Sequence, residues 1–594
     1  MILSEKKKLW ILFAIALIIR LVAWPFSQVM EADAVSRMFA AEDVIRHHGA
    51  VSCLQWPSGH IYFLSLGQLL TNQRIFGSVL LSLLAGAGSV IPFYLFTRNV
   101  FNRNGAFYAA LIFTCSPLIF RLSLVPLSEI YHVFFSLMAI WSLTEALRNP
   151  GRKMRWTIWA GIFATIACGG RFEAWVMSGL LGLILLARRE WKMFFVFGLI
   201  SAIYPIGWML FCYSKTGSFF VSLEMVQFQN FVVTHANDNL DAITMSRRTI
   251  FFPLSWMIAI TPVVMLLLFS LLPRLLKTWR TEPLRLLFIA LFVFFLVFFI
   301  FESRDGSLAD QHRYSVTLVM LSMPLFALWF ENPRRKKAKI IVSVLLAAGM
   351  IPWAYCWERI PWHKLAFGND DRHNAIAQIV SGTYKEFHAI PKIEPAVLKE
   401  ITEKEKTEYK KGEGLFIDFW GWAPSYYVQL QSPYDCKLYM TYDYPKHDGD
   451  QGRIAKFFGQ YPSGQIVLFD YSSLSREIQL HGNLAEIDSV PGGLLLEPRL
   501  QKDHIRLFNY RYLSPEETAE QRQKLNFTAP LFTREKDLRY YLDVIPCDGN
   551  TLSGIWQEAV ANRRSVDEQV RRVAEWQLQN DIESQKKTNT DSVR

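Results

Sequence analysis

Two carboxylates stand one residue apart in the segment MEADAVSRMFAAEDVIRHHG (30–49), directly after an apolar run. The residues that follow Glu31 and Asp33 place apolar side chains such as Val35 on one face of a helix, with charged ones such as Arg37 elsewhere. Such a helix lies along a membrane surface. Carboxylates held between a spanning helix and an interfacial helix are poorly solvated, so we expect one of them to have a raised pKa and to act as a general base. The alternative is a solvated acidic turn that caps the interfacial helix.

The composition indicates a membrane protein. The chain has 594 residues, of which 51% are hydrophobic and only 19% charged. A soluble protein of this length would be about one-quarter charged, so an ordinary cytosolic enzyme and a disordered scaffold are excluded. The seven cysteines form no CxxC or Cys/His cluster, which excludes a disulfide-rich module and a zinc site of usual spacing.

Apolar runs that could each form a membrane helix fill the first 357 residues. We count eleven, near residues 9–25, 75–97, 105–120, 126–146, 157–170, 172–186, 193–213, 251–272, 286–301, 314–330 and 340–357. No small-residue cleavage site follows the first run, so we expect an uncleaved anchor rather than a signal peptide. The predicted fold class is a polytopic α-helical membrane protein of about eleven transmembrane helices.

The positions of Lys and Arg predict the orientation. With the amino terminus in the cytoplasm, the inner loops 1–8, 98–104, 147–156, 187–192, 273–285 and 331–339 carry 21 basic and four acidic residues. This bias predicts a cytoplasmic amino terminus and, after an odd number of spans, an extracytoplasmic carboxyl-terminal part. It also explains the net charge of +11 without a basic face for nucleic acid. We expect a bacterial inner membrane.

We expect three parts: a transmembrane domain (1–357) with outer loops 26–74 and 214–250, an extracytoplasmic domain (358–557), and a charged tail (558–594) that is helical or disordered. Within the second part, short apolar segments predict strands and amphipathic segments predict helices. The strands are 414–419, 437–442, 464–469 and 492–497, and the helices are 423–431 and 452–461. Their alternation predicts a small α/β domain.

Four motifs follow the acidic pair in order along the chain. They are WPSGHIYFLSL (56–66), GAGSVIPFYLFTRNVFNRNGAFYAALIFTCSP (86–117), LSLVPLSEIYHVFFSL (122–137) and the late Arg-Tyr of QHRYSV (311–316). This order resembles the polytopic GT-C glycosyltransferases over about residues 1–330, nearest to the protein O-mannosyltransferase and aminoarabinose-transferase group, glycosyltransferase family 39 and its neighbours. The resemblance implies a GT-C-like fold whose first outer loop holds a modified DxD motif. Glu31-Ala32-Asp33 matches its ExD form, whereas the WWDYG motif of oligosaccharyltransferases has no counterpart here.

The resemblance implies a hexosyl- or pentosyltransferase. The donor would be a polyprenyl-phosphate-linked sugar, and the acceptor a hydroxyl of a lipid, glycan or protein at the extracytoplasmic face, with inversion at the anomeric carbon. Such a reaction needs a base for the hydroxyl proton and cations for the departing phosphate. Asp33 is the predicted base, and Glu31 orients the acceptor or holds a divalent metal ion with Asp33. No cofactor is required, a metal is optional, and the other partners are membrane lipids rather than nucleic acid.

Cations in apolar surroundings are candidates for the phosphate, since charges in a membrane are costly unless they are used. Arg171 in GGRFEAW precedes Glu173 by two residues, and Arg313 opens the tenth apolar run beside His312. Guanidinium groups bind phosphate through paired hydrogen bonds. We predict that Arg171, Arg313 and His312 contact the phosphate, with Glu173 in support. The alternatives are that Arg171 and Glu173 only neutralise each other and that Arg313 reaches the lipid headgroups.

Further polar residues have open roles. His60 completes the W-P-x-x-H motif and is either a phosphate contact or a satisfied interfacial histidine. Glu129 lies inside an apolar run, should face the bundle interior, and either polarises the donor pocket or makes a structural hydrogen bond. We interpret Arg20 and Arg121 as residues that reach the headgroups.

Features of the outer segments complete the prediction. The loop 214–250 is either a lid or a passive linker. Aromatic residues after the first predicted strand suit either sugar binding or burial in a small core, and two cysteines could pair in an oxidising compartment. These residues are Trp420, Trp422, Tyr426 and Tyr427, and Cys436 and Cys547.

Two other functions compete with sugar transfer from a lipid phosphate. A lipid-linked glycan ligase or polymerase would share the donor but place its functional residues in a late outer loop. A transporter or flippase of lipid-linked sugars would show duplicated halves, and the sequence contains no internal repeat. The glycosyltransferase therefore explains the sequence best.

Overall fold

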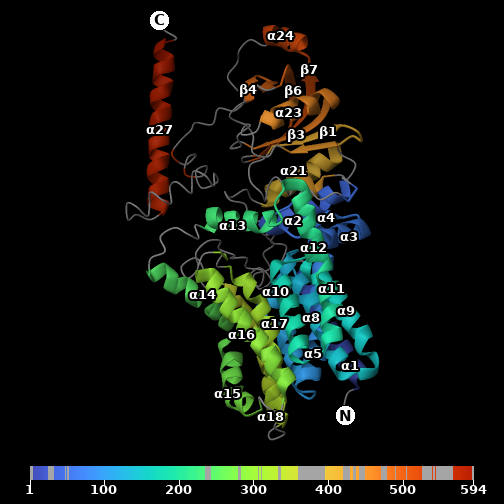
Figure 1. Ribbon diagram of the computed structural model, residues 1–594. Helices are drawn as coiled ribbons and strands as arrows, with labels where there is room; N and C mark the ends of the chain where they lie inside the picture. Colours follow the sequence, from blue (N-terminus) through green and yellow to red (C-terminus); the bar gives the residue numbers. More distant parts are fainter. Residues whose placement is uncertain are drawn as a thin grey trace. The chain divides into compact units, whose positions relative to one another are not determined.

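The structure is a computed structural model. It describes residues 4–24, 32–46, 48–49, 53–234, 242–278, 282–304, 307–308, 311–331, 336–358, 395–418, 428–432, 437–440, 448–469, 478–487, 490–502, 505–524, 538, 542 and 566–591. The chain divides into two compact units, Met1–Glu386 and Phe387–Arg594 (Figure 1).

The first unit is helical throughout its described residues. Its α-helices are α1 (Glu5–Ala23), α2 (Ala32–Arg46), α3 (Gly59–Thr71), α4 (Arg74–Gly88), α5 (Val90–Val100), α6 (Ala106–Cys115), α7 (Pro117–Leu122), α8 (Ser128–Arg148), α9 (Lys153–Cys168), α10 (Phe172–Ala187), α11 (Trp191–Ser201), α12 (Ile203–Thr216), α13 (Val221–Thr234), α14 (Ala242–Ile260), α15 (Pro262–Thr278), α16 (Pro283–Arg304), α17 (Val316–Ser322) and α18 (Lys336–Glu358). Short 3-10 helices are η2 (Pro150–Arg152), η3 (His312–Ser315) and η4 (Met323–Phe330). Each predicted apolar run falls on one of these helices or on a consecutive group of them.

Among the described residues, five helical stretches are long and apolar enough to cross a membrane. They are Arg74–Val100, Ser128–Arg148, Trp191–Thr216, Pro283–Arg304 and His312–Phe330. A sixth span results if the pair Arg248–Ile260 and Val263–Leu271, bent by 103°, is counted as one. The bend follows from the sequence, because Pro262 disfavours a helical conformation at Thr261, which has a φ of 71°. Two more apolar helices, α6 and α10, are shorter than a full span.

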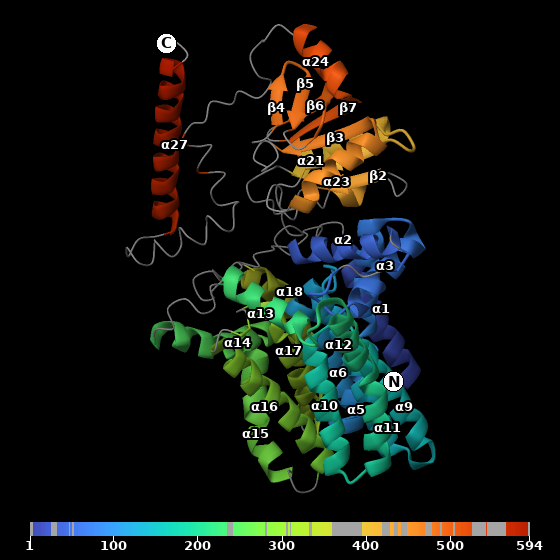
Figure 2. The ribbon, with the colours of Figure 1, turned by 45° about the horizontal axis from the view of Figure 1, so that its top comes forward.

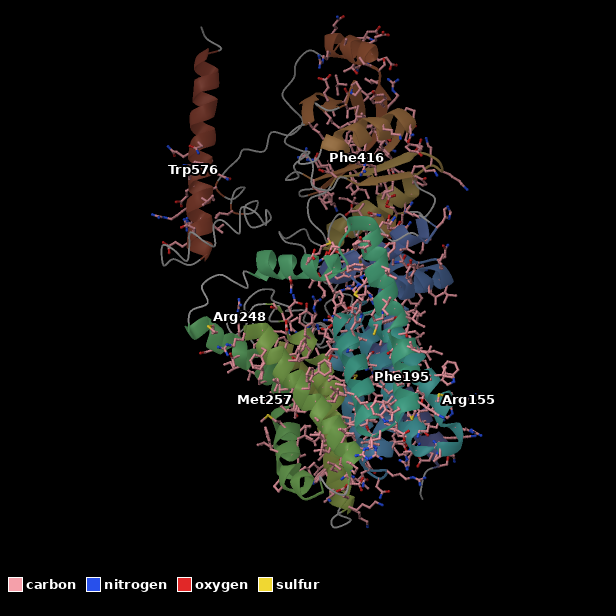
Figure 3. The ribbon with its side chains drawn as sticks, in the orientation of Figure 1. Arg155, Phe195, Arg248, Met257, Phe416 and Trp576 are labelled. Carbon is pink, nitrogen blue, oxygen red and sulfur yellow. The ribbon has the colours of Figure 1, made fainter. Side chains whose placement is uncertain are left out.

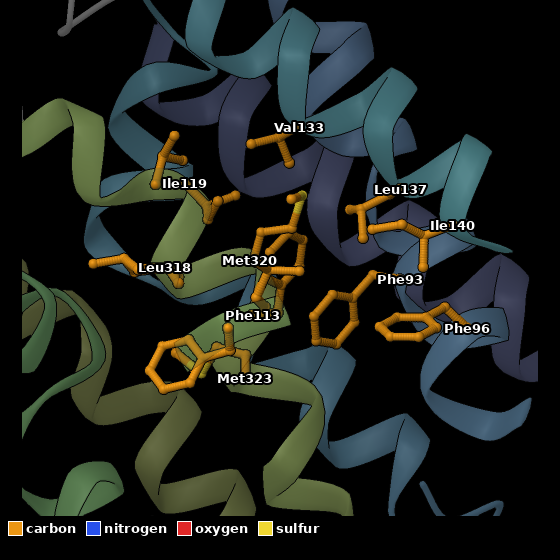
Figure 4. Packing of buried hydrophobic residues seen from close by; sticks show 14 of the residues in the cluster. Phe93, Phe96, Phe113, Ile119, Val133, Leu137, Ile140, Leu318, Met320 and Met323 are labelled. Carbon is orange, nitrogen blue, oxygen red and sulfur yellow. The ribbon is translucent and has the colours of Figure 1, made fainter. Parts of the chain in front are cut away.

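A large apolar cluster holds the helices of the first unit together. Phe93 of α5 stacks on Phe113 of α6 with ring centroids 4.1 Å apart. Ile119, Val133 and Met320 come from α7, α8 and α17, and all three are fully buried in the same cluster (Figure 4). Helix α17 is far from the other four helices in the sequence, so the cluster fixes α17, and η3 directly before it, relative to α8.

Other helices turn large apolar side chains outward. Phe195 of α11, labelled in Figure 3, is 60% exposed, and Leu199 on the same helix is 74% exposed. A soluble protein rarely exposes such contiguous apolar surface. Contact with lipid accounts for these exposed apolar side chains. The helix can face lipid because its backbone hydrogen bonds are made within the helix.

The second unit contains a seven-stranded mixed sheet in the order β2-β1-β3-β7-β6-β5-β4 (Figure 2). The strands are β1 (Gly414–Ile417), β2 (Lys437–Met440), β3 (Ser463–Phe469), β4 (Ile478–His481), β5 (Leu484–Ile487), β6 (Gly493–Lys502) and β7 (Ile505–Leu513). Strands β2, β1 and β3 run parallel, and the remaining pairs are antiparallel. The helices are α21 (Pro395–Glu408), α23 (Asp448–Gln460), α24 (Pro515–Lys524) and α27 (Val566–Asp591).

The α/β pattern expected for this part is partly observed. The predicted strands correspond to β1, β2, β3 and β6, and the predicted helix 452–461 lies on α23. Phe416 of β1, labelled in Figure 3, packs against Phe458 of α23, and the ring centroids are 5.1 Å apart. Strands β4, β5 and β7 were not predicted.

Candidate active site

Asp33 and Arg313 form the ion pair around which the site is built. Asp33 is the second residue of α2, and its Oδ2 accepts a hydrogen bond from Nη2 of Arg313 in η3. The side chain of Arg313 is only 6% exposed, whereas that of Asp33 is 36% exposed. The carboxylate therefore keeps a face that a substrate can reach.

The ionisation state of Asp33 differs from the expectation. Burial raises the pKa of this carboxyl, but the guanidinium of Arg313 outweighs burial and holds the pKa below its ordinary value of 3.8. The predicted raised pKa of a carboxylate in this segment is therefore wrong for Asp33. The reason is a partner 280 residues away in the sequence. An ionised carboxylate at neutral pH is nonetheless the form that a general base requires.

Glu129, the second residue of α8, connects Arg313 to a second arginine. Its side chain is 2% exposed, and its Oε1 accepts a hydrogen bond from Nη1 of Arg171 at 2.6 Å. The same oxygen lies 3.4 Å from Nε of Arg313. Nε of Arg313 also donates to Oε1 of Gln311 at 2.7 Å. Glu129 faces the interior of the helical unit, as its position in an apolar run predicts.

Arg171 caps the start of α10 and is held from several sides. Its Nη2 and Nε donate to the two carboxylate oxygens of Glu173 at 2.6 and 3.1 Å. Its Nη1 also reaches Oγ of Ser128 at 3.3 Å. The ring of Tyr314 lies 4.8 Å from the guanidinium carbon of Arg171 and 5.5 Å from that of Arg313. Both arginines thus contact the same aromatic ring.

These contacts form a row of alternating charges in the order Glu173, Arg171, Glu129, Arg313 and Asp33, which we call the charge row. Each carboxylate in it is the second residue of a helix, on α10, α8 and α2 respectively. Carboxylates are stabilised at helix amino termini by the unpaired N–H groups and the helix dipole. The structure thus brings Asp33, Arg171 and Arg313, each predicted from the sequence as a site residue, into one connected group of side chains.

His60 lies against the turn that carries Arg171. Its backbone N–H donates to the carbonyl of Gly169 at 3.0 Å, and its ring meets Tyr131 edge-on at 5.7 Å. The approach depends on glycine, because a Cβ on Gly59 would lie 2.7 Å from Cα of Gly169. The imidazole is fully buried, and neither ring nitrogen has a hydrogen-bond partner among the described residues. Burial, with Arg37 and Arg171 nearby, lowers the pKa of His60 well below 6.5, so the ring is neutral.

His312 contacts a different arginine. Its Nε2 lies 2.7 Å from Nη1 of Arg121, which is 2% exposed. Arg20 is also fully buried and donates to the carbonyl of Ala16 and to Oγ1 of Thr114. The interpretation of Arg20 and Arg121 as headgroup contacts is therefore wrong, because both satisfy their charge with polar groups inside the helical unit.

Arg37 belongs to the site although the sequence analysis gave it no role. It lies one helical turn after Asp33 on α2 and is 7% exposed. Its guanidinium carbon lies 4.5 Å from the centre of the Trp56 ring. Its Nε and Nη1 have no hydrogen-bond partner among the described residues. The spacing of four residues from Asp33, which puts both side chains on one helical face, is the signal that could have identified it.

Several predicted features fall outside the described residues or keep their open status. Within the described residues, no group of three or more His, Cys, Asp or Glu side chains could hold a metal ion. In the loop 214–250, α13 begins at Val221, and its Ser222 donates to the carbonyl of Leu54, close to the W-P-x-x-H motif. Among the residues named in the sequence-based prediction, those that lie outside the described residues are Glu31, Trp420, Trp422, Tyr426, Tyr427, Cys436 and Cys547.

Comparisons with known proteins agree with this architecture. Residues 56–213 match the family model described as dolichyl-phosphate-mannose-protein mannosyltransferase. The chain has the fold of a GT-C membrane glycosyltransferase, and the resemblance that the motifs predict is confirmed at this level. A search of curated proteins by sequence finds no significant match.

Two solved structures illustrate the likeness. ArnT from Cupriavidus metallidurans bound to undecaprenyl phosphate is similar with a TM-score of 0.56 and 11% identity, over 85% of this chain and 98% of that chain. The Saccharomyces cerevisiae protein O-mannosyltransferase Pmt1-Pmt2 complex bound to the sugar donor has a TM-score of 0.32 and 16% identity, over 37% of this chain and 34% of that chain. At these identities the likeness to ArnT concerns the fold.

Proposed function

We propose that this chain is a membrane glycosyltransferase that moves a sugar from a polyprenyl-phosphate donor to an acceptor hydroxyl on the extracytoplasmic face, with inversion. The observation that carries the proposal is Asp33, an ionised and partly exposed carboxylate at the end of a buried charge row. A general base must be reached by its substrate, and the exposed face of Asp33 allows this contact.

In the proposed mechanism each group has a task in a single displacement. The acceptor hydroxyl loses its proton to Asp33 as its oxygen attacks the anomeric carbon. The bond from that carbon to the phosphate oxygen breaks on the opposite side, which inverts the configuration. Negative charge grows on the departing phosphate, and the positive groups of the site, with Arg171, Arg313, His60 and His312 as the predicted contacts, stabilise it.

Arg313 also holds the base in place. Because its Nη2 is bonded to Asp33 while its Nε is bonded to Gln311 and faces Glu129, the carboxylate of Asp33 cannot rotate freely. Preorganisation of this kind lowers the barrier without reorganisation during the reaction. If a divalent ion were bound, Glu31 and Asp33 would hold it, and it would supply positive charge beside the carboxylate of Asp33.

The donor class and the side of the membrane have separate support. The similar ArnT structure contains undecaprenyl phosphate, and the distribution of Lys and Arg places α2 and the second unit on the extracytoplasmic side. In Figure 1, α2 and α3 lie at the end of the helical unit opposite the amino terminus. The acceptor would be a lipid, a glycan or a protein, and the membrane a bacterial inner membrane.

Mass spectrometry of cell-envelope glycolipids and glycoproteins tests the function. Cells that lack the protein should lose a single hexose or pentose unit from one class of envelope molecule, and the wild-type chain should restore it. Loss of a whole oligosaccharide would indicate a lipid-linked glycan ligase instead. A lipid-linked sugar that accumulates on the inner leaflet would indicate a transporter. Either of these results, or no difference at all, would contradict the proposal.

A further inference from the structure

We propose that Arg37, a residue that none of the motifs assigns, makes the direct cationic contact to the donor phosphate, with His60 as a neutral partner beside it. The inference rests on the proposed function and names the phosphate-binding residue of that same site. Arg171 and Arg313 then act mainly by holding the carboxylates.

The other two arginines of the site, Arg171 and Arg313, already donate hydrogen bonds to neighbouring side chains. Arg171 uses Nε, Nη1 and Nη2 on Glu173, Glu129 and Ser128. Arg313 uses Nε and Nη2 on Gln311 and Asp33. A guanidinium binds phosphate best through two parallel N–H donors. Arg171 could present such a pair only by releasing Glu173 or the buried Glu129, which is costly. Arg313 already uses two of its nitrogens on Gln311 and Asp33.

Arg37, in contrast, holds hydrogen-bond donors without a partner among the described residues in a fixed orientation. Its guanidinium stacks on Trp56 at 4.5 Å, so its face is covered while its edge carries N–H groups without a partner among the described residues. A buried polar group without a partner loses the free energy of hydration and gains nothing in return. A bound anion would satisfy these donors.

The balance of charges in the site also points to Arg37. Asp33, Glu129 and Glu173 carry three negative charges, and the charge row contains only two arginines to balance them. Arg37 supplies the third positive charge and interacts electrostatically with Glu129 and Asp33, although its Nε and Nη1 have no hydrogen-bond partner among the described residues. Within that part of the chain, an incoming anion can therefore bind these two donors without displacing a hydrogen-bond partner.

His60 can supply a second hydrogen bond to the same phosphate. It is influenced by the charge of Arg37, is fully buried, and has both ring nitrogens without partners among the described residues. A neutral imidazole donates one hydrogen bond and accepts another, so it can donate to a phosphate oxygen. The unsatisfied groups of Arg37 and His60 come from different helices, α2 and α3.

Binding of undecaprenyl phosphate to the purified full-length protein in detergent tests the inference. Undecaprenol, which lacks the phosphate, serves as a second probe. For Arg37→Gln we expect the affinity for undecaprenyl phosphate to fall at least about 10-fold, equal to about 1.4 kcal/mol, while the unfolding temperature without ligand stays close to that of the wild type. Arg37→Lys restores the charge but not the paired donors, so it should recover only part of the affinity.

Two variants serve as comparisons. Arg46→Gln removes a cation from the other end of α2, where Glu42 keeps its ion pair with Arg74 at 3.0 Å, and should bind like the wild type. Arg313→Gln should lower the unfolding temperature without ligand, because Asp33 loses its partner, and should lower the affinity for undecaprenyl phosphate less than Arg37→Gln does.

The outcomes separate the inference from the proposed function. If the wild type binds undecaprenyl phosphate and Arg37→Gln binds it equally well, the assignment of Arg37 is wrong and the proposed function stands. An equal loss of undecaprenol affinity would also overturn the assignment, because the contact would then be to the isoprenoid. If the wild type binds no undecaprenyl phosphate, both the donor class and the inference fail.

Discussion

Glu129→Gln tests whether the charge row positions the base. The substitution keeps the shape and an acceptor oxygen but removes the charge between Arg171, at 2.6 Å, and Arg313, at 3.4 Å. A hydrogen bond to a charged group contributes about 1.5–3 kcal/mol and a neutral one about 0.5–1.5 kcal/mol, so two weakened contacts cost about 2 kcal/mol. Because Glu129 is buried and each arginine retains another partner, we expect a folded protein with a less firmly held Arg313.

The kinetic consequence follows from the position of Asp33. Arg313 bonds both Gln311 and Asp33, so movement of its guanidinium moves the base. Misplacement of a catalytic group by about 1 Å can cost 100-fold in rate, and we expect kcat to fall by about 10- to 100-fold with the donor KM nearly unchanged. Steady-state kinetics of sugar transfer by the purified protein measure both constants.

Glu145→Gln is the matched control on the same helix. Glu145 accepts side-chain hydrogen bonds from Nδ2 of Asn99 at 2.7 Å, Nε1 of Trp141 at 3.3 Å and Nδ2 of Asn149 at 2.6 Å, but it lies near the other end of α8. It should lower stability and leave kcat unchanged. Wild-type kcat in Glu129→Gln would refute the idea that the charge row positions Asp33.

Two further predictions follow from the same contacts. The lowered pKa of Asp33 predicts that the rate falls with acid only below pH 3.8 and is flat across about pH 5–7. In Arg313→Gln the effect of burial on the pKa of Asp33 is no longer opposed by the guanidinium, so the fall in rate should move to higher pH. A fall in rate near pH 6.5 in the wild type would instead indicate titration of a histidine. Gly59→Ala brings a Cβ to 2.7 Å from Cα of Gly169 and should destabilise the protein by about 1–3 kcal/mol in thermal unfolding, whereas Gly198→Ala, with open space around it, should not; equal effects would contradict the close packing of α3 on the turn before α10.

The sequence predicted the helices and part of the site. Hydrophobic length alone located the apolar helices, since each must satisfy its backbone within the membrane. Residue type and position singled out Asp33, Arg171 and Arg313 as candidate site residues. Contacts between residues that are distant in the sequence could not be predicted in this way. The ionisation of Asp33 depends on Arg313, and the role of Glu129 as a bridge depends on two arginines from other elements.

Arg37 shows why local pattern was insufficient. A helix on a membrane surface should expose its charged side, but α2 is covered on several sides: Arg37 is 7% exposed, and Glu42 is fully buried against Arg74. Helical periodicity reports which residues share a face and not what covers that face. The short strands β4 and β5 were missed for a similar reason, because four residues carry too little alternation to be recognised.

Sugar transfer by Asp33→Asn in a single turnover tests the central claim most directly. The asparagine can still accept a hydrogen bond from Arg313 but cannot take the acceptor proton. We predict a rate at least about 100-fold below wild type, with undecaprenyl phosphate still bound through Arg37, and an unchanged rate for Asp43→Asn on the same helix. Transfer by Asp33→Asn at the wild-type rate would show that Asp33 is not the base.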